Sequence, residues 1–207
     1  FRSTEAFLID EADSGTGSAF DAAKQSRKDR STVTAMLEAL APQPHERVLE
    51  VGTGRGLAAA ALSSLADEVV TYERVDSMAE FARRSLFDTG CSNVEVRLGD
   101  ALRDLQGGDE RFDAILVSAR CGEIPIALLP HLEVGGRMLV PIDEADRKHR
   151  LVRVDKLGPE EFDEQIVGKL EVSRPLTDVL VRMGAATPAR LSEASRRASQ
   201  SGKHLWT

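Results

Sequence analysis

The sequence is poor in aromatic and basic residues. Aromatic side chains make up 4% of its 207 residues, and 27 Lys and Arg stand against 34 Asp and Glu, which gives a net charge of −7. Binding to nucleic acid is therefore not expected, because stacking of bases needs aromatic rings and phosphate binding needs clustered Lys and Arg. No apolar run approaches the roughly 20 residues that cross a bilayer, so we expect no association with membranes.

Cysteines and secretory signals are also scarce. The two cysteines, Cys91 and Cys121, do not have the spacing of metal ligands. We therefore expect no metal site and two free thiols in a reducing compartment. No secretory pattern is present. With 42% hydrophobic residues, the chain can bury one sizeable core. These features predict a globular domain in the cytoplasm.

The most informative segment is a run of glycines that follows an apolar stretch. Val48–Val51 is largely apolar, Gly52, Gly54 and Gly56 alternate with other residues, and an alanine-rich run begins at Leu57. This pattern predicts a strand, a tight turn and a helix, the unit with which α/β proteins bind adenosine-containing cofactors. A dinucleotide fingerprint would have glycine at position 57. The observed G-x-G-x-G spacing, preceded by an acid at position 50, is typical of class I S-adenosylmethionine (SAM) methyltransferases.

Two acidic residues follow the next two predicted strands. Glu73 ends the strand 69–72, at the position where an acid accepts hydrogen bonds from a ribose diol. Asp100 follows the strand 94–98 and could accept a hydrogen bond from the adenine amino group. Each could instead be a solvated strand end or a turn residue, but their order and spacing together predict a nucleoside site. The expected cofactor-binding residues are Glu50, Gly52, Thr53, Gly54, Gly56, Glu73, Arg74, Asp100 and Ala101.

Strands alternate with helices along most of the chain, which predicts an α/β fold with a doubly wound, mostly parallel Rossmann-like sheet. We expect Ser31 to cap the first helix, Ser77 and Glu80 to form a capping box, and Val134-Gly135-Gly136 to form a turn. The predicted strands are 48–51, 69–72, 94–98, 112–117 and 137–142, and the predicted helices are 31–40, 57–65, 77–90, 101–105 and 124–132.

The C-terminal part of the chain departs from this alternation. Two extended segments, 149–156 and 165–173, have no long helix between them and are expected to pair antiparallel at one edge of the sheet. Thr187-Pro188 then predicts the start of a helix. We divide the chain into an irregular segment or lid at 1–30, a main domain at 31–177 and a helical extension at 178–207.

Several segments of the main domain are similar to one family. They include residues 47–54 (RVLEVGTG), 67–74 (DEVVTYER), 93–100 (NVEVRLGD), 112–119 (FDAILVSA) and 135–142 (GGRMLVPI). On these segments the chain resembles the protein-L-isoaspartate O-methyltransferases over residues 31–177. The resemblance implies the class I methyltransferase fold, SAM as cofactor, and a protein or peptide substrate that bears an aspartyl or isoaspartyl residue.

Two positions depart from the family pattern. The family usually has a Thr-Ile-Ser-x-Pro stretch before the first helix, and its hydroxyl sits at the reacting carboxylate. In this chain that hydroxyl position falls on Lys28 and the proline falls on Arg30, with Ser26 and Ser31 as nearby hydroxyls. The glycine turn, Gly-Ser-Gly-Tyr in the family, reads Gly54-Arg55-Gly56-Leu57 here.

Transfer of a methyl group to a carboxylate needs alignment rather than a general base. A carboxylate with a reference pKa near 4 is already ionised at neutral pH. The basic segment 24–30 could form a carboxylate-binding lid in which Lys28 or Arg30 orients the acceptor, or it could be a solvated run of charges. Ser118, after the predicted strand 112–117, could contact the substrate or cap a turn. The expected catalytic residues are Lys28, Ser31 and Ser118.

We therefore expect a SAM-dependent O-methyltransferase that methylates an isoaspartyl or aspartyl carboxylate, whose ester collapses to a succinimide (aspartimide). Two versions stay open: general protein repair, and modification of a chosen aspartate in a ribosomally made peptide. The residues at positions 28 and 30 favour the second. The alternatives are a small-molecule methyltransferase on the same fold and a non-catalytic SAM-binding module. The sequence does not indicate an oligomeric state.

Overall fold

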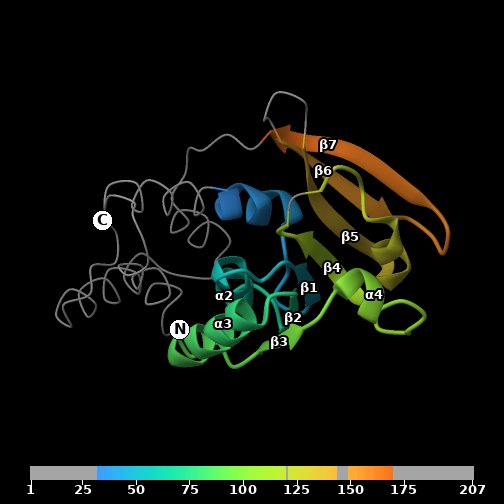
Figure 1. The fold of residues 1–207 in the computed structure, drawn as a ribbon. Coiled ribbons are helices and arrows are strands. Elements are labelled where there is room, and N and C mark those ends of the chain that lie inside the picture. The colour runs from blue at the N-terminus through green and yellow to red at the C-terminus, as the bar shows by residue number, and fades with distance from the viewer. Residues whose placement is uncertain (1–31, 120, 144–148, 170–207) are drawn as a thin grey trace.

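The computed structural model describes residues 32–119, 121–143 and 149–169. They form a seven-stranded sheet with the order β3-β2-β1-β4-β5-β6-β7 (Figure 1). Strands β1 to β5 pair in parallel, and β6 and β7 add antiparallel pairings at one edge. The strands are β1 Arg47–Val51, β2 Glu68–Glu73, β3 Val94–Leu98, β4 Phe112–Val117, β5 Leu132–Asp143, β6 His149–Lys156 and β7 Phe162–Lys169.

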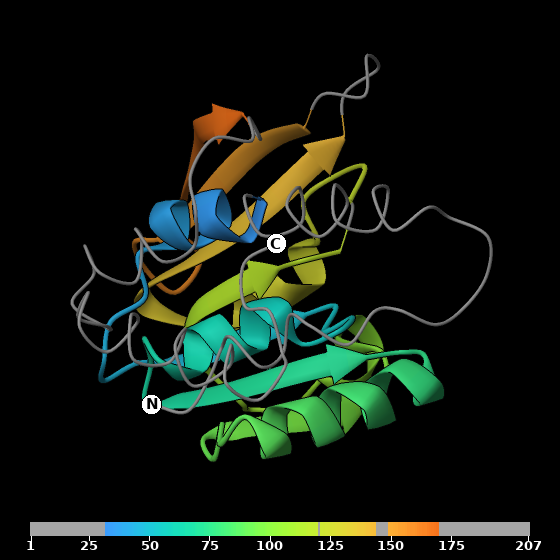
Figure 2. The ribbon, with the colours of Figure 1, turned by 90° about the vertical axis from the view of Figure 1, so that its left-hand side faces the viewer.

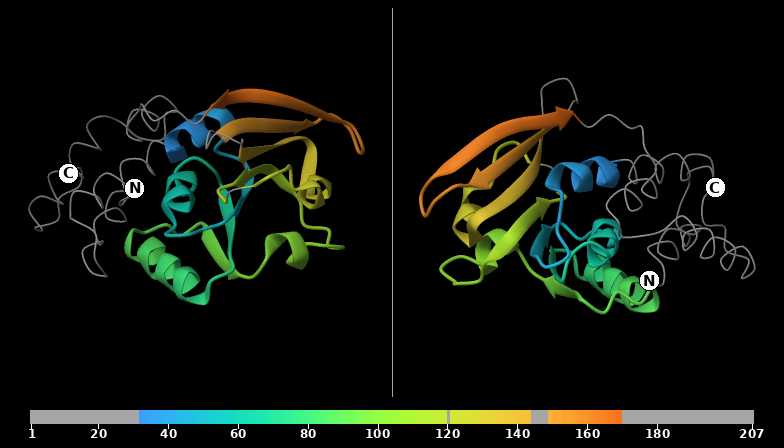
Figure 3. Two further views of the ribbon diagram at one scale, coloured as in Figure 1. Left: turned by 45° about the horizontal axis from the view of Figure 1, so that its top comes forward. Right: turned by 180° about the vertical axis from the view of Figure 1, so that it is seen from behind.

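Helices cover both faces of this sheet. The helix over residues 32–40, α2 (Leu57–Ser63) and α3 (Asp76–Asp88) lie on one side, and α4 (Ala101–Asp104) and the 3-10 helix η2 (Ile126–His131) lie on the other (Figures 1 and 2). The two views of Figure 3 show the same arrangement, with the sheet between the two sets of helices. This arrangement confirms the predicted α/β fold, a doubly wound sheet that is mostly parallel and has an antiparallel edge.

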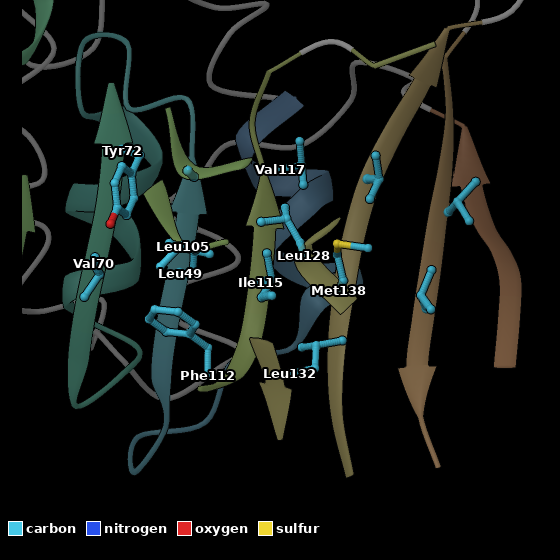
Figure 4. Packing of buried hydrophobic residues seen from close by; sticks show 14 of the residues in the cluster. Leu49, Val70, Tyr72, Leu105, Phe112, Ile115, Val117, Leu128, Leu132 and Met138 are labelled. Atoms are coloured by element: carbon cyan, nitrogen blue, oxygen red, sulfur yellow. The ribbon is translucent and has the colours of Figure 1, made fainter. Parts of the chain in front are cut away.

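Strands β1 and β4 are buried on both faces, which explains their nearly continuous apolar sequences. Successive side chains of a strand point to opposite faces. Val48 accordingly packs in the core on the side of helix 32–40. Leu49 and Ile115 pack on the other side, with Leu128 of η2, in the cluster that Figure 4 shows.

Two predicted elements near β5 have a different structure. The segment 124–132, predicted as a helix, forms only the six-residue 3-10 helix η2, with Pro130 inside it. Proline lacks the N–H that a longer α-helix needs. The predicted turn at Val134-Gly135-Gly136 is instead part of β5. A Cβ at Gly136 would lie 2.8 Å from the carbonyl oxygen of Asp113, and the register of β4 against β5 shifts at this point. Gly136 therefore allows close strand pairing, whereas Gly135 takes a φ of 88° at the irregular part of β5.

The predicted capping box at the start of α3 is wrong. The helix begins at Asp76, and its N-cap is Val75, which provides no side-chain hydrogen bond. The first turn closes on the carbonyl oxygen of Val75, which accepts hydrogen bonds from the N–H groups of residues 78 and 79. Ser77 and Glu80 consequently lie inside the helix, where Glu80 pairs with Arg84 at 3.0 Å.

The other predicted boundaries that can be compared with the structure are those of the two edge strands and of the helix over residues 32–40. β6 covers the predicted segment 149–156. β7 begins at Phe162, earlier than the predicted 165–173, and residues 170–173 lie outside the described residues. The helix over 32–40 agrees with the prediction, but its expected cap Ser31 lies outside the described residues, as do the segments 1–30 and 178–207. Within the described part of the chain, no helix has the length and apolar character needed to cross a membrane.

A buried ion pair fastens the first helix to the sheet. Arg137 on β5 contacts both carboxylate oxygens of Glu46, at 2.6 and 2.9 Å, and donates to the carbonyl oxygens of Leu40 and Ala41, each at 2.6 Å. Burial raises the pKa of Glu46, but the hydrogen bonds from Arg137 and from the N–H of Gln43, together with the charge of Arg137, outweigh this and lower the pKa below its ordinary value. Arg137 thereby satisfies carbonyl groups that the end of a helix leaves without partners.

Candidate functional site

The glycine turn lies at the carboxyl end of β1, directly before α2. Gly52, Gly54 and Gly56 have φ angles of 98°, 53° and 82°, a conformation that residues with a Cβ rarely adopt. At Gly52 a Cβ would also lie 3.1 Å from the main-chain nitrogen of Ala119. The space that a Cβ would take at Gly54 is open. A ligand can therefore approach the main chain at this turn.

Glu73, at the end of β2, is tied to the glycine turn. Its Oε2 accepts a hydrogen bond from the N–H of Gly54 at 2.8 Å, and its Oε1 accepts one from the N–H of Val75 at 3.0 Å. The N–H of Gly52 donates to the carbonyl oxygen of Tyr72 at 2.9 Å. The structure thus brings the predicted ribose-binding acid and the glycine turn together.

Glu50 lies at the centre of a buried network that joins three strand ends. Its carboxyl group accepts hydrogen bonds from the hydroxyls of Thr71, at 2.7 Å, and Ser118, at 2.8 Å. The Thr71 hydroxyl also contacts that of Thr53 at 2.6 Å. The pKa of Glu50 is raised to about 7, chiefly by burial; the hydrogen bonds from the two hydroxyls oppose this rise, and the negative charge of Glu73 adds to it. A positive charge bound beside this group would favour its ionised form.

Of the two hydroxyl residues that contact Glu50, Ser118 was predicted as a site residue from the sequence and Thr71 was not. Ser118 lies at the carboxyl end of β4, as predicted, and its hydroxyl is held by Glu50; contact with an acceptor stays a prediction. Thr71 is fully buried in β2 and was not among the predicted site residues. The sequence feature that could have indicated Thr71 is that it carries the one hydroxyl in the otherwise apolar run Val69–Tyr72. The register of β1 and β2 places Thr71 beside Glu50.

Asp100 begins α4 and lies close to the end of β2. Its Oδ1 accepts a hydrogen bond from the N–H of Leu102 at 3.2 Å, and its own N–H donates to the carboxylate of Asp104 at 2.9 Å. The N–H of Gly99 donates to the carbonyl oxygen of Glu73 at 2.9 Å. The two acids predicted to bind a nucleoside therefore lie at neighbouring strand ends.

Three exposed apolar side chains lie next to these acids and were missed by the sequence analysis. Val75, Leu98 and Leu102 are 53%, 47% and 41% exposed. Val75 and Leu102 donate main-chain hydrogen bonds to Glu73 and Asp100, and Leu98 pairs with Glu73 across β2 and β3. Apolar surface beside carboxylate acceptors suits a purine ring with an amino group. The missed signal is apolar residues at or shortly after strand ends, where polar residues are usual.

The other predicted residues have no such contacts in the described structure. Arg74 is exposed beside Glu73, and Ala101 is buried. Lys28 and Ser31, together with the alternatives at positions 26 and 30, lie outside the described residues. No group of three or more His, Cys, Asp or Glu side chains that could hold a metal ion occurs in the parts of the chain that the structure describes.

The chain is similar to bacterial protein-L-isoaspartate O-methyltransferases. It is 41% identical over 125 residues to that of Brucella anthropi, a match that covers 59% of this chain and 56% of the relative. It is 44% identical over 131 residues to that of a Bradyrhizobium species, covering 63% of this chain and 60% of the relative. The chain therefore spans less than two thirds of the length of these relatives.

Two solved structures share the fold. A protein-L-isoaspartate O-methyltransferase has a TM-score of 0.59 at 22% identity, over 78% of this chain and 55% of the other. A Plasmodium falciparum protein described as a beta-aspartate methyltransferase (PCMT), solved in complex with S-adenosyl-L-homocysteine, has a TM-score of 0.53 at 18% identity, over 82% and 85%. The model of the protein-L-isoaspartate(D-aspartate) O-methyltransferase family matches residues 18–176, and the chain belongs to this family.

Proposed function

We propose that this chain is a SAM-dependent carboxyl O-methyltransferase that acts on an isoaspartyl or aspartyl side chain of a protein or peptide. The observation that carries the proposal is the placement of the glycine turn, Glu73 and Asp100 at neighbouring strand ends in a chain of this family. Ligands of open α/β sheets bind beyond the carboxyl ends of the strands. Because Cys91 and Cys121 are not joined in a disulfide, we place this activity in a reducing compartment such as the cytoplasm.

The residues at this edge of the sheet fit SAM by their chemistry. The Glu73 carboxylate suits a ribose diol, Asp100 suits the adenine amino group, and the neighbouring apolar side chains suit the purine ring. The open main chain at Gly54 suits the methionine end, and the Glu50 carboxyl suits its ammonium group. SAM supplies a methyl group bound to a positively charged sulfur.

The acceptor side has to position a carboxylate and exclude water. A carboxylate is ionised at neutral pH and needs no general base, so alignment of its oxygen supplies most of the catalytic effect. We assign this task to Ser118, at the carboxyl end of β4, and to Lys28 and Ser31, which precede helix 32–40. The methyl ester is then attacked by the following main-chain nitrogen, which forms a succinimide and releases methanol.

The role of the basic segment can be tested separately from cofactor binding. If Lys28 and Arg30 hold the acceptor, their joint replacement by Met should raise the KM for peptide roughly tenfold, the loss of a charged hydrogen bond. The affinity for S-adenosylhomocysteine should stay within twofold. An unchanged KM would assign acceptor binding to Ser31 or Ser118 instead.

A methyl-transfer assay with three peptides tests the proposed function. The peptides share one sequence and carry isoaspartate, aspartate or alanine at one position. Methylation of the isoaspartyl peptide alone supports repair, and methylation of the aspartyl peptide supports modification of a chosen aspartate. Absence of transfer to both acidic peptides, in a protein that binds S-adenosylhomocysteine, would contradict the proposal.

A further inference from the structure

The end of β2 contacts the glycine turn through three consecutive residues. The hydroxyl of Thr71 lies 2.6 Å from the hydroxyl of Thr53. The carbonyl oxygen of Tyr72 accepts a hydrogen bond from the N–H of Thr53 at 3.1 Å. The carboxylate of Glu73 accepts one from the N–H of Gly54 at 2.8 Å. β2 therefore supports the turn residue by residue, and Thr71 does so with its side chain.

Thr71 also contacts Glu50, its partner on the neighbouring strand β1. The Thr71 hydroxyl donates to Oε2 of Glu50 at 2.7 Å. Both residues are fully buried, and Thr53 is only 4% exposed, so these three side chains are shielded from bulk water. Thr71 is thus the side chain that joins the buried carboxyl group to the glycine turn.

The number of available protons sets the direction of these hydrogen bonds. A hydroxyl has one proton to donate and two lone pairs that accept, whereas an ionised carboxylate only accepts. When Glu50 is ionised, Thr71 donates its proton to Glu50, and the oxygen of Thr71 accepts the proton of Thr53. Thr71 consequently fixes the orientation of a hydroxyl within the glycine turn.

The same hydroxyl stabilises the charge of Glu50. A buried carboxylate is unfavourable unless hydrogen bonds compensate for the lost contact with water. Burial raises the pKa of Glu50, and the hydrogen bonds from Thr71 and Ser118 oppose this rise. Valine at position 71 would remove the donor to Oε2 and the acceptor for Thr53 in one step. Glu50 would then be ionised less readily, and the turn would lose a side-chain contact.

We propose that Thr71 is a positioning residue for cofactor binding, which acts through Glu50 and Thr53 and does not itself touch the cofactor. This inference rests on the proposed function, in which the Glu50 carboxyl faces the ammonium group of the cofactor and the glycine turn lies against its methionine end. The Thr71 hydroxyl orients the charged carboxylate and holds the turn in the shape that admits the ligand.

Calorimetry with S-adenosylhomocysteine, which keeps the ammonium group of SAM, tests this role. Thr71→Val removes the hydroxyl, and Thr71→Ser retains it. Ser63→Ala is the matched control, because Ser63 is the last residue of α2, at the far end from the glycine turn, and its hydroxyl donates to Asn93 at 2.6 Å. Each variant is also measured in a chain that carries Glu50→Gln, and urea unfolding checks that every variant is folded.

Thr71→Val should weaken binding roughly tenfold, the loss of a hydrogen bond to a charged group. Thr71→Ser and Ser63→Ala should stay within about threefold of the parental protein, because neither removes that hydrogen bond. In the chain with Glu50→Gln, the effect of Thr71→Val should fall to about threefold or less, since a neutral amide needs less stabilisation than a carboxylate. A residue that only supports the fold would cause the same loss with and without Glu50→Gln.

Three results would overturn the inference: unchanged affinity in folded Thr71→Val, equal losses for valine and serine, or equal losses with and without Glu50→Gln. Should Thr71→Val not fold, Thr71→Cys takes its place under the same criteria, because a thiol is only a weak donor. A parental protein that binds S-adenosylhomocysteine but methylates no acidic peptide would contradict the proposed function alone, since calorimetry still tests Thr71. A parental protein that does not bind S-adenosylhomocysteine would contradict both.

Discussion

The buried carboxyl group of Glu50 should make the stability of the protein depend on pH. Its pKa is about 7 in the folded chain, against an ordinary value of 4.5. As the pH rises, the unfolded chain therefore loses this proton first. The contribution of Glu50 to the free energy of unfolding should be highest below pH 4.5, fall between pH 4.5 and 7, and level off above. One pKa unit corresponds to 1.36 kcal/mol, so the full difference is about 3 kcal/mol.

Glu50→Gln isolates this effect. Glutamine keeps the shape of the side chain, and the hydroxyls of Thr71 and Ser118 can accept as well as donate hydrogen bonds. Urea unfolding at a series of pH values should give similar stabilities for both proteins near pH 4.5 and a more stable variant at pH 8, by up to about 3 kcal/mol. Equal slopes between pH 4.5 and 7 in the two proteins would refute the reasoning.

Other ionisable groups do not obscure this comparison. Arg97 and Arg47 lower the pKa of Glu110 to about 2 by hydrogen bonding. The stability that Glu110 contributes is therefore present above its ordinary value of 4.5 and is lost as the pH falls toward 2. This effect lies below the pH range of the Glu50 effect. It is also the same in parental protein and variant, so the difference between them reports Glu50 alone.

Three further substitutions test the site and its support. Glu73→Ala should weaken S-adenosylhomocysteine binding by roughly 1.5–3 kcal/mol, the loss of a charged hydrogen-bonding group; calorimetry that shows unchanged affinity would remove Glu73 from the site. Asp100→Asn should leave stability nearly unchanged, because Asn also caps helices well, but should reduce the preference for adenosyl over inosyl homocysteine. A preference equal to that of the parental protein would refute the assignment. Arg137→Met should destabilise the fold by about 3–5 kcal/mol by leaving Glu46 buried and unpaired, and the loss in urea unfolding should shrink when Glu46→Gln is added.

The sequence was most informative where local composition and tertiary environment agree. The apolar run Phe112–Val117 forms a strand that is buried on both faces, and the alternating glycines after β1 all have positive φ. Glu73 and Asp100 come together because Glu73 ends β2 and Asp100 follows the end of β3, its parallel neighbour in the sheet. In each of these cases, the local element that the sequence pattern predicts is also the one that requires that type of residue.

The sequence was less informative where one residue type serves several purposes. Glycine is common in turns, but Gly136 stands in β5 because the neighbouring strand leaves no room for a Cβ. Ser77 and Glu80 have the spacing of a capping box, yet the first turn of α3 closes on the Val75 carbonyl. The role of Thr71 depends on its register with β1. The contacts of Gly136 and Thr71 with neighbouring strands join distant parts of the chain, and they cannot be deduced from residue spacing.

The most direct test of the central claim is the chemical nature of the methylated product. The protein should transfer a labelled methyl group from SAM to an acidic peptide, and mild alkali should release the label as methanol, because a carboxyl ester is base-labile. Replacement of the acidic residue by alanine should abolish the transfer. A label that survives alkali, or that appears equally on the alanine peptide, would contradict carboxyl methylation.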